Sequence, residues 1–428
     1  MDFTTPPQPE PSAPPHYPQE GEQPRARFLD LSTPPHILTL VLVAGIGALN
    51  MNVILPSLPA MADWFKTDYA VMQLAVSAYL AATAVLQIIV GPLSDRFGRR
   101  PILIGSIFIF LLATVAAALA PTIEIFMAAR LVQAVVVGGF ALSRAIVRDM
   151  VPMERAASMI GYVTMGMTLA PMVGPVIGGV LQEMFGWQSV FWMTAAMGVA
   201  VLAIVILDLR ETNQHRSTGM TSQFRSYPEL LTSRRFWGFV FSAMFASGMF
   251  FAYIGGAPYV AQYHLSLSPS ALGVYFIFIA IGYMFGNFLS GRYAARAGVF
   301  TMMIAGALIA ASGIILSLVY FSLGGSHAAG FFGPLFFLGM GNGMVLPSAN
   351  AGMISVRPHL AGSAAGLGGA MQIGGGAALS VLAGHLLTPQ SGPFPLLWLM
   401  LAAGILGIFM TLYTRHIDRL MASSGKQV

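Results

Sequence analysis

The stretch Gly91-Pro92-Leu93-Ser94-Asp95-Arg96-Phe97-Gly98-Arg99-Arg100 decides how this chain folds. An apolar run over 69–90 precedes it, and a second apolar run over 101–120 follows it. Each run is long enough to cross a bilayer as a helix, which takes about 20 residues. The ten residues between the runs include one aspartate and three arginines, so this link must lie in water. We therefore predict two membrane helices joined by an exposed polar link.

The residue types within the link suit a tight connection. Gly91 and Gly98 permit sharp backbone turns. Pro92 is suited to the first turn of a new segment. Asp95 lies among three arginines and is placed to bridge charged groups on neighbouring helix ends.

Composition excludes a soluble protein. Hydrophobic residues make up 56% of the 428 residues, charged residues only 9%, and the mean hydropathy is +0.74. So few charges could not cover the surface of a soluble chain of this size. The absence of cysteine excludes disulfides, thiolate catalysis and cysteine-based metal sites. The net charge of +5 does not indicate nucleic-acid binding, because the basic residues lie between apolar runs and form no single patch.

The pattern of two apolar runs around a polar link continues along the chain. The segment 1–36 is rich in proline, has no signal-peptide pattern, and is expected to be a disordered cytoplasmic tail. After it, twelve apolar runs of membrane-spanning length follow one another. The predicted spans are 37–59, 69–90, 101–120, 123–147, 156–181, 187–208, 236–260, 270–291, 299–321, 329–354, 360–386 and 394–413.

Lysine and arginine residues indicate the orientation of these spans. The links after odd-numbered spans carry Lys66 and almost no other cation. The links after even-numbered spans carry Arg96, Arg99, Arg100, Arg148, Arg155, the cations from Arg210 through Arg235, Arg292, Arg296 and Arg357. We therefore predict that the even-numbered links and both termini are cytoplasmic.

The chain also divides into two similar halves. The link 209–235 is the longest and most polar, and it separates six spans from six. Asn287-Phe-Leu-Ser-Gly-Arg292, after the eighth span, echoes Gly91-Pro-Leu-Ser-Asp-Arg96, after the second, with Gly291 in place of Asp95. Internal repeats of this kind imply a substrate cavity between the halves near the bilayer midplane.

The predicted fold is an all-α membrane protein with twelve transmembrane helices in two pseudo-symmetric six-helix bundles. The bundles comprise 37–208 and 236–414. The cytoplasmic linker 209–235 joins them, and a cytoplasmic tail, 415–428, ends the chain.

The link at Gly91–Arg100 resembles the loop between helices 2 and 3 of the major facilitator superfamily, Gly-x-x-x-Asp-Arg-x-Gly-Arg-Arg. The resemblance implies a membrane carrier in which this loop gates the cytoplasmic side. It implies that Asp95 pairs with Arg148, at the inner end of span 4, in the outward-open state and releases it in the inward-open state. The gating residues that it implies are Gly91, Asp95, Arg96, Gly98, Arg99, Arg100 and Arg148.

Span 5 is rich in glycine and proline. Glycines four residues apart let two helices approach closely, and prolines weaken the backbone ladder so that a helix can bend. The order of these residues resembles the antiporter motif of drug exporters in the same superfamily, with Ala170 where that motif usually has glycine. The resemblance favours export, and we expect Gly174 and Gly178 to pack against span 8 or span 11. The motif residues are Gly161, Pro171, Gly174, Pro175, Gly178 and Gly179.

Other motifs narrow the resemblance. Arg130-Leu-Val-Gln133 in span 4 is similar to a motif of the superfamily, and Arg144-Ala-Ile-Val-Arg148-Asp149 follows it. Leu55-Pro-Ser-Leu-Pro59 lies in span 1, and Gly186-Trp187 precedes span 6. Together they resemble the bicyclomycin-resistance and chloramphenicol-efflux branch of drug:proton antiporters, whose members lie in the bacterial inner membrane.

One feature of that branch is missing. Its members usually carry a carboxylate in span 1, where this chain has Asn50 and Asn52. No aspartate or glutamate lies in the interior of any predicted span. A buried carboxylate is the usual proton carrier because desolvation raises its pKa. Three routes remain open: an acid at a helix end such as Glu124 or Asp149, a histidine such as His385, or transport without a proton.

Amides, aromatic rings and one arginine remain as candidates for binding a substrate. Apolar walls with a few amides suit ligands without a strong charge. Arg130 lies about 9 Å along the helix from Glu124, and an arginine so deep requires a polar cavity or a partner. The candidate substrate-binding residues are Asn50, Asn52, Tyr79, Arg130, Met165, Phe250, Tyr253, Asn342 and Gln372.

The sequence predicts a monomeric secondary transporter that exports small amphiphilic drugs or antibiotics by alternating access and is driven by protons. One alternative is a carrier of an anionic or zwitterionic metabolite, with Arg130 as the counter-charge. A second is a channel or sensor without turnover. No enzyme constellation, phosphate loop or metal-ligand spacing is found, so we expect no enzyme activity, no cofactor and no metal.

Overall fold

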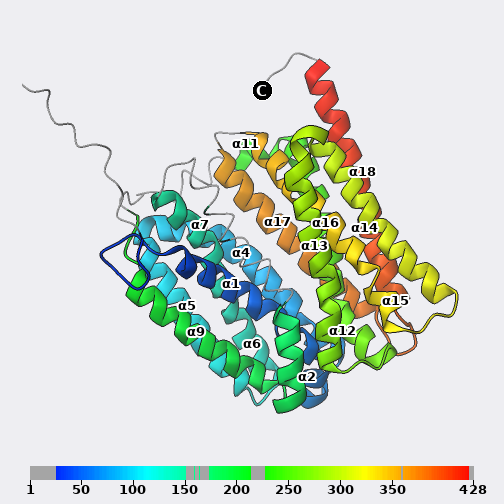
Figure 1. Ribbon diagram of the computed structural model, residues 1–428, viewed down its shortest axis with the longest axis horizontal. Helices are drawn as coiled ribbons and strands as arrows, with labels where there is room; N and C mark the ends of the chain where they lie inside the picture. Colours follow the sequence, from blue (N-terminus) through cyan, green and yellow to red (C-terminus); the bar gives the residue numbers. More distant parts are fainter. Residues whose placement is uncertain are drawn as a thin grey trace, which may run out of the picture.

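The computed structural model describes residues 26–150, 159, 163, 173–213, 227–357 and 360–423. These residues form helices that run side by side in two groups, one from each half of the chain (Figure 1). The part of the chain so described contains no strand. We call 26–213 the first half and 227–423 the second half.

The described residues of the first half form a series of helices. They are α1 (Ile37–Asn52), η1 (Leu55–Ser57), α2 (Leu58–Phe65), α3 (Tyr69–Met72), α4 (Leu74–Phe97), α5 (Arg99–Ala118), α6 (Ile123–Gln133), η2 (Ala134–Val137), α7 (Gly138–Met150), a helix over Val173–Phe185, and α9 (Gln188–Asp208).

The helices of the second half are longer on average. They are α11 (Tyr227–Leu231), α12 (Arg234–Tyr259), the π-helix η3 (Val260–His264), α13 (Pro269–Ala297), α14 (Val299–Ser322), α15 (Ala328–Phe332), α16 (Leu335–Ser355), α17 (Ala361–Leu386) and α18 (Phe394–Ser423).

Eleven helical segments of the described residues are long and apolar enough to cross a membrane. They match eleven of the twelve predicted spans. The fifth predicted span, 156–181, falls largely outside the described residues, and its described end belongs to the shorter apolar helix Val173–Phe185. The all-helical membrane architecture is therefore confirmed, and the count of twelve spans stays a prediction.

The link at Gly91–Arg100 differs from the prediction. Helix α4 continues through Phe97, α5 begins at Arg99, and Gly98 alone connects them, with a φ of +103°. The expected ten-residue polar link and the start of a new segment at Pro92 are therefore wrong. Pro92 lies inside α4. Hydropathy marks where a helix leaves the membrane, but its backbone hydrogen bonds can continue into water.

The second half repeats this connection. Helix α13 runs through the echo of the motif at 287–292 and ends at Ala297. Gly298, with a φ of +83°, is the single residue between α13 and α14. Glycine adopts positive φ without steric cost, which accounts for its use at both sharp turns.

Two faces of the molecule can be distinguished. The face that carries Arg96, Arg99, Arg100, Arg234 and Arg296 is called the basic face, and the described chain both begins and ends there (Figure 1). The face at the other ends of the same helices is called the opposite face. It carries the end of α2 and the link between η3 and α13.

Among the described residues, the buried apolar side chains of the two halves pack together toward the opposite face and form separate clusters toward the basic face. One cluster there joins residues of both halves, for example Val53 and Met72 with Tyr253 and Leu335. Toward the basic face each half has its own separate cluster, the first around Leu40, Val90 and Val205. The second surrounds Phe236, Met303 and Met353. The halves therefore meet at the opposite face and diverge toward the basic face, as Figure 1 shows.

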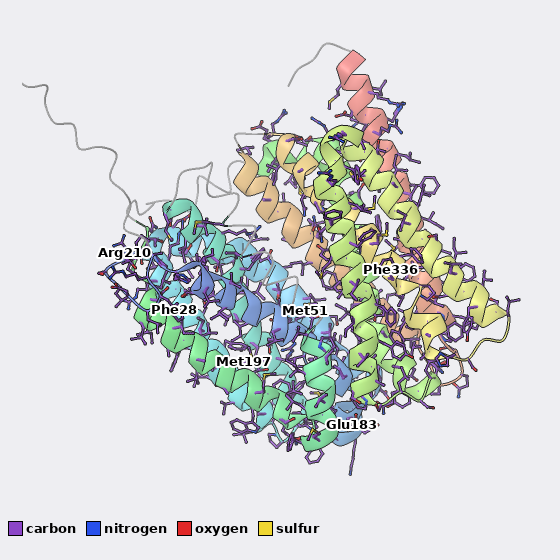
Figure 2. All side chains as sticks on the ribbon, in the orientation of Figure 1. Phe28, Met51, Glu183, Met197, Arg210 and Phe336 are labelled. Carbon is purple, nitrogen blue, oxygen red and sulfur yellow. The ribbon has the colours of Figure 1, made fainter. Side chains whose placement is uncertain are left out.

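A clasp closes the first half at the basic face. Asp208, the last residue of α9, is fully buried and accepts hydrogen bonds from the backbone N–H groups of Leu29 and His36, at 2.8 and 2.9 Å. The Thr39 hydroxyl donates a third bond of 2.7 Å. Arg210, which follows α9 and is labelled in Figure 2, donates from Nη1 to the Ser32 carbonyl of the segment before α1, at 3.5 Å. The first and the last helix of this half are thereby tied together.

Candidate transport site and gate

Arg130 is the most buried cation of the described residues, with 1% of its side chain surface exposed. Its three nitrogens all donate hydrogen bonds: Nε to the Ala75 carbonyl at 3.1 Å, Nη1 to Gln133 Oε1 at 2.8 Å, and Nη2 to the Asn50 carbonyl at 3.1 Å. The guanidinium carbon lies 4.2 Å from the centre of the Tyr79 ring. Arg130 therefore connects α6 with α1 and α4.

These contacts explain how a buried arginine is tolerated without an acid. Asn50 lies in the last turn of α1, where carbonyls lack helical partners and carry the negative end of the helix dipole. The Tyr79 ring adds a cation–π contact. Among the described residues no ion pair includes Arg130. The expected polar surrounding is therefore present, and it consists of carbonyls, an amide and a ring.

The network extends to a fourth helix. Gln133 Nε2 donates to Thr114 Oγ1 on α5 at 2.8 Å, and Asn50 Nδ2 donates to the Tyr79 hydroxyl at 3.3 Å. Of the predicted substrate-binding residues, the structure thus brings Asn50, Tyr79 and Arg130 together. Thr114 was not identified from the sequence, since a lone threonine in an apolar span carries no distinguishing signal.

Asn52 lies on α1 near Asn50 but donates to the Ala48 carbonyl, at 2.7 Å, and within the described part of the chain it makes no hydrogen bond to this network. Phe250, Tyr253 and Gln372 belong to the second half. Gln372 donates to Asn350 Oδ1 at 2.7 Å, and Phe250 contacts Phe251, with ring centres 5.8 Å apart. Tyr253 is buried against Phe276. Met165 lies outside the described residues.

Several of these buried polar atoms have no hydrogen-bond partner. They are Oδ1 of Asn50 and of Asn52, the Tyr253 hydroxyl, and both side-chain polar atoms of Asn342. An unpaired buried polar group costs about 1–3 kcal/mol, so such atoms mark hydrogen-bonding capacity that a ligand or water can use. All of them are uncharged.

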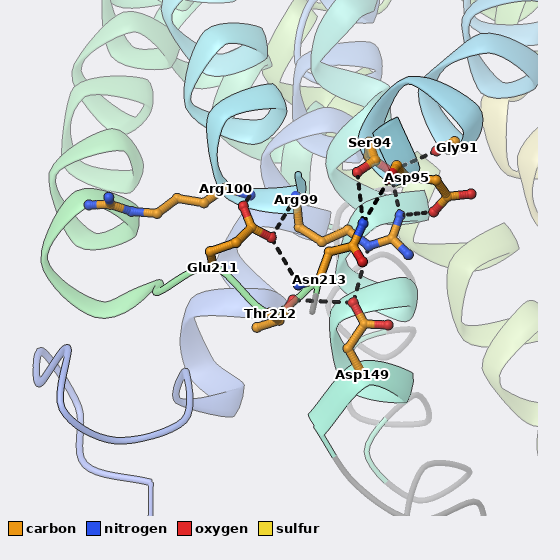
Figure 3. A network of polar contacts seen from close by, with 9 residues as sticks. All are labelled: Gly91, Ser94, Asp95, Arg99, Arg100, Asp149, Glu211, Thr212 and Asn213. Atoms are coloured by element: carbon orange, nitrogen blue, oxygen red, sulfur yellow. Dashed lines mark hydrogen bonds and ion pairs between the residues drawn. The ribbon is translucent and has the colours of Figure 1, made fainter. Parts of the chain in front are cut away.

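The gate residues form a second network at the basic face (Figure 3). Arg99, 8% exposed, donates from Nη1 to Asp95 Oδ1 and to the Ser94 hydroxyl. Its Nε donates to Asp149 Oδ2 at 3.1 Å. Arg99 therefore ties the end of α4 to the end of α7. Among the described residues Asp95 has one charged partner, Arg99, so the group that bridges two helix ends is Arg99 and the bridging role expected of Asp95 stays a prediction.

The remaining predicted gate residues lie around this bridge. Arg96 is exposed and lies 5.2 Å from the centre of the Phe97 ring, and Arg100 Nη2 donates to the Ile206 carbonyl at 3.2 Å. Gly91 accepts a hydrogen bond from the Ser94 hydroxyl at 2.8 Å. The side chain of Arg148 lies outside the described part of the structure, so its pairing with Asp95 stays a prediction.

The start of the linker binds to the same network. Glu211 accepts hydrogen bonds from the backbone N–H groups of Arg99, at 2.9 Å, and Arg100, at 3.2 Å. Thr212 donates to Asp149 Oδ2 at 3.2 Å, and Asn213 Nδ2 donates to the Asp95 carbonyl at 2.9 Å. The first N–H groups of a helix lack partners and attract negative charge, so Glu211 caps α5 from outside the helix.

Glu211 also explains the glycine at the turn. A Cβ atom at residue 98 would collide with the Glu211 carboxylate. Gly98 is therefore required twice, for its positive φ and for the space that the carboxylate occupies. The sequence marks Gly98 clearly, but it gives no sign that a linker glutamate fills this space.

Replacing Glu211 with alanine should lower the free energy of unfolding by about 1 kcal/mol, the usual effect of losing a helix N-cap. Thermal unfolding of the purified protein in detergent measures this. Asp68→Ala is the matched control, because Asp68 is exposed and, although it is the N-cap residue of α3, its side chain makes no capping hydrogen bond. Equal stabilities of the two variants would contradict the capping role.

The antiporter-motif residues that the structure describes make close helix contacts. A Cβ at Gly178 would collide with the Val53 carbonyl, and one at Gly174 would lie 3.1 Å from Asn52 Cβ. The expected packing against span 8 or span 11 is therefore wrong for these two glycines, which pack against the end of α1. Gly179 does approach span 8, at Pro269.

Pro175 also belongs to this contact with span 8, because its carbonyl lies where a Cβ on Gly273 of α13 would be. The motif residues thus contact α1 on one side and the second half of the chain on the other. Gly161 and Pro171 fall outside the described residues.

The sequence was compared with known families. Residues 40–381 match the family model described as Major Facilitator Superfamily. The chain belongs to this superfamily.

Three curated members of the superfamily show how far the likeness extends. The "Uncharacterized MFS-type transporter YdgK" of Bacillus subtilis (strain 168) is 30% identical over 81% of this chain and 87% of its own length. The "Bicyclomycin resistance protein homolog" of Haemophilus influenzae is 26% identical over 83% and 90%. "Multidrug resistance protein D" of Escherichia coli (strain K12) is 27% identical over 88% and 92%. The predicted resemblance to the drug-resistance branch of the superfamily is confirmed.

A solved structure shares the fold. A bacterial homologue of the human lysosomal transporter Spinster, in an inward-facing and unoccupied conformation, has a TM-score of 0.72. The alignment covers 90% of this chain and 96% of that one at 18% identity. The likeness shows that the helices follow the arrangement of the superfamily.

Proposed function

We propose that this chain exports small amphiphilic compounds, such as antibiotics, by alternating access between two six-helix bundles. The observation that supports this most is the packing of the two halves, whose described residues share one apolar cluster toward the opposite face and none toward the basic face. A carrier caught open on one side has this organisation. The drug-resistance names of its relatives point to the class of substrate.

The chemistry of the buried polar atoms agrees with an uncharged or weakly charged substrate. The unpaired atoms of Asn52, Tyr253 and Asn342 are amide and hydroxyl groups. Ligand sites with apolar walls and a few such groups fix the orientation of a ligand without requiring a charge.

The alternative of an anionic metabolite finds less support. Each Arg130 nitrogen is engaged with a protein oxygen, and the side chain is almost fully buried. A substrate anion would have to displace these partners before it could pair with the guanidinium.

The basic face is proposed to lie in the cytoplasm, with both termini, because lysine and arginine accumulate on that side of inner-membrane proteins. The halves would then be apart toward the cytoplasm, an inward-open form. The exporter is proposed to act as a monomer in the bilayer.

Proton drive is proposed to act through Asp149. Its Oδ2 accepts from both Arg99 and Thr212, so protonation would weaken the ion pair between Asp149 and Arg99 and loosen the tie between the ends of α7 and α4. Of the other groups considered, Glu124 and His385 are exposed, and no contact joins them to the gate network.

The test is uptake into inverted vesicles. Accumulation of a bicyclomycin-type antibiotic should rise when the lumen is acid, and Asp149→Asn should remove this response while Glu124→Gln retains it. If the wild type concentrates the compound to the same extent with and without the pH gradient, proton drive is refuted but the export proposal is not. If a strain lacking its own pumps gains no resistance from the chain, and its vesicles concentrate no drug, the export proposal fails.

A further inference from the structure

The contact between the halves at the opposite face contains one fully buried polar side chain that reaches across. Gln73, between α3 and α4, is 0% exposed. Its Nε2 donates to the Ser380 carbonyl on α17 at 2.7 Å and also to the Ser380 hydroxyl. Ser380 is likewise fully buried. A side chain of the first half is thus bonded inside the second half.

Two glycines make room for Gln73. A Cβ at Gly255 of α12 would collide with Gln73 Nε2 and with the Ser380 hydroxyl. A Cβ at Gly384 of α17 would lie 2.8 Å from Gln73 Oε1. Beside them the Tyr69 hydroxyl donates to the Gly255 carbonyl at 2.9 Å. Two helices of the second half therefore form a slot that fits the amide.

Apart from the bonds of Gln73 and Tyr69, the polar contacts that the described residues make across this face are weaker. The Tyr263 hydroxyl lies 3.5 Å from Asp63 Oδ1, and the Ser270 N–H donates to Glu183 Oε2 at 3.3 Å, both at exposed positions. Figure 2 shows Glu183 at this edge of the molecule. Contacts of this kind exchange readily with water and contribute little to the stability of the closed form. A buried donor that loses its acceptor, in contrast, raises the free energy of the protein.

The Gln73 amide is only half satisfied. Its Oε1 is buried and has no hydrogen-bond partner. Closure thus forms the two bonds from Nε2 but removes the hydration of Oε1. The net free energy that favours the closed form is therefore small enough for the halves to separate again. A carrier that must open this face in every cycle needs such a balance.

We propose that Gln73 is a positioning residue for transport, whose insertion into the slot of Gly255, Ser380 and Gly384 closes the opposite face and sets how often that face opens. The inference rests on the alternating-access motion proposed above and not on the nature of the substrate.

The test uses distances between pairs of spin labels. Because the chain has no cysteine, labels can be placed at will. Lys66→Cys with Leu323→Cys reports on the opposite face, and Phe97→Cys with Arg296→Cys on the basic face; all four side chains are exposed. The wild type in nanodiscs without substrate provides the reference distributions, which also show whether both distances sample more than one state.

Gln73→Ala should raise the ratio of separated to closed populations at the opposite face about tenfold, since two buried hydrogen bonds are lost. The distance at the basic face should shorten in the same molecules. Gly255→Ala should act in the same direction by filling the slot. Gly374→Ala is the control on α17, because a Cβ there meets nothing within 4 Å.

The double variant Gln73→Met with Ser380→Ala should keep the closed distance, because apolar groups of similar shape replace the amide and the hydroxyl, and the Ser380 carbonyl that loses its Gln73 donor lies within helix α17. Partial unfolding would broaden both distributions and could not shorten one while lengthening the other. Unchanged distances in Gln73→Ala and Gly255→Ala would overturn the proposal. A wild type with one fixed state at both faces would refute alternating access itself, whichever compound is carried.

Discussion

Arg130→Ala is expected to abolish transport and to lower the free energy of unfolding by several kcal/mol. The substitution leaves the Asn50 carbonyl, at the end of α1, and the Gln133 amide oxygen without their donor in a buried site, and it removes the Nε bond to the Ala75 carbonyl inside α4. Each unpaired buried acceptor costs about 1–3 kcal/mol. Thermal unfolding in detergent and uptake into vesicles measure the two effects.

Arg130→Lys distinguishes a structural brace from a counter-charge. Lysine keeps the positive charge, but its single ammonium group cannot reach acceptors on three helices or stack on Tyr79 as a planar guanidinium does. If Arg130 is a brace, the lysine variant should be nearly as unstable as the alanine variant. Retained stability together with transport of an anionic compound would instead support the metabolite carrier.

Gly178→Leu is expected to eliminate export while leaving insertion into the membrane near normal. A Cβ at this position already collides with the Val53 carbonyl, so the larger side chain must push the helix Val173–Phe185 away from α1. Overpacking typically costs about 1–3 kcal/mol, and here the obstacle is backbone that cannot rotate away. Drug resistance of cells and the amount of protein in their membranes are the two measurements.

Gly105→Leu provides the matched control for that experiment. Gly105 lies in membrane-spanning α5, and a Cβ there meets no atom within 4 Å. This variant should insert and export like the wild type. Equal export by Gly178→Leu would show that close packing on α1 is not required.

The sequence predicts the membrane spans well because the length of an apolar run has a direct physical meaning. It fails at the ends of helices, where water replaces lipid but the backbone ladder continues. Helix α4 shows this most clearly, since its last turn holds Asp95 and Arg96 and still forms helix up to Phe97. Gly98 was recognisable as a turn because glycine tolerates its backbone angle.

The candidate site was predictable only where a residue type is costly in a membrane. Arg130 is such a residue, and a polar surrounding for it was expected from its depth. The backbone carbonyls of two other helices provide this surrounding. Which carbonyls do so depends on tertiary packing, so the sequence alone could not identify them. Gln73 and Ser380 are 307 positions apart, and Glu211 lies in a polar linker, so no local pattern identifies them.

The buried carboxylate of Asp208 joins the beginning and the end of the first half into a closed ring of helices, which we call the hoop. Because it joins the segment before α1 to the end of α9, the first half can tilt as one piece without its terminal helices peeling apart. The same attachment gives the upstream chain a fixed point of departure. A truncation before residue 26 leaves the hoop intact, whereas one that removes Leu29 deprives a buried carboxylate of a donor. A tag fused directly to Ala26 would therefore start beside the end of α9, on the rim of the first half.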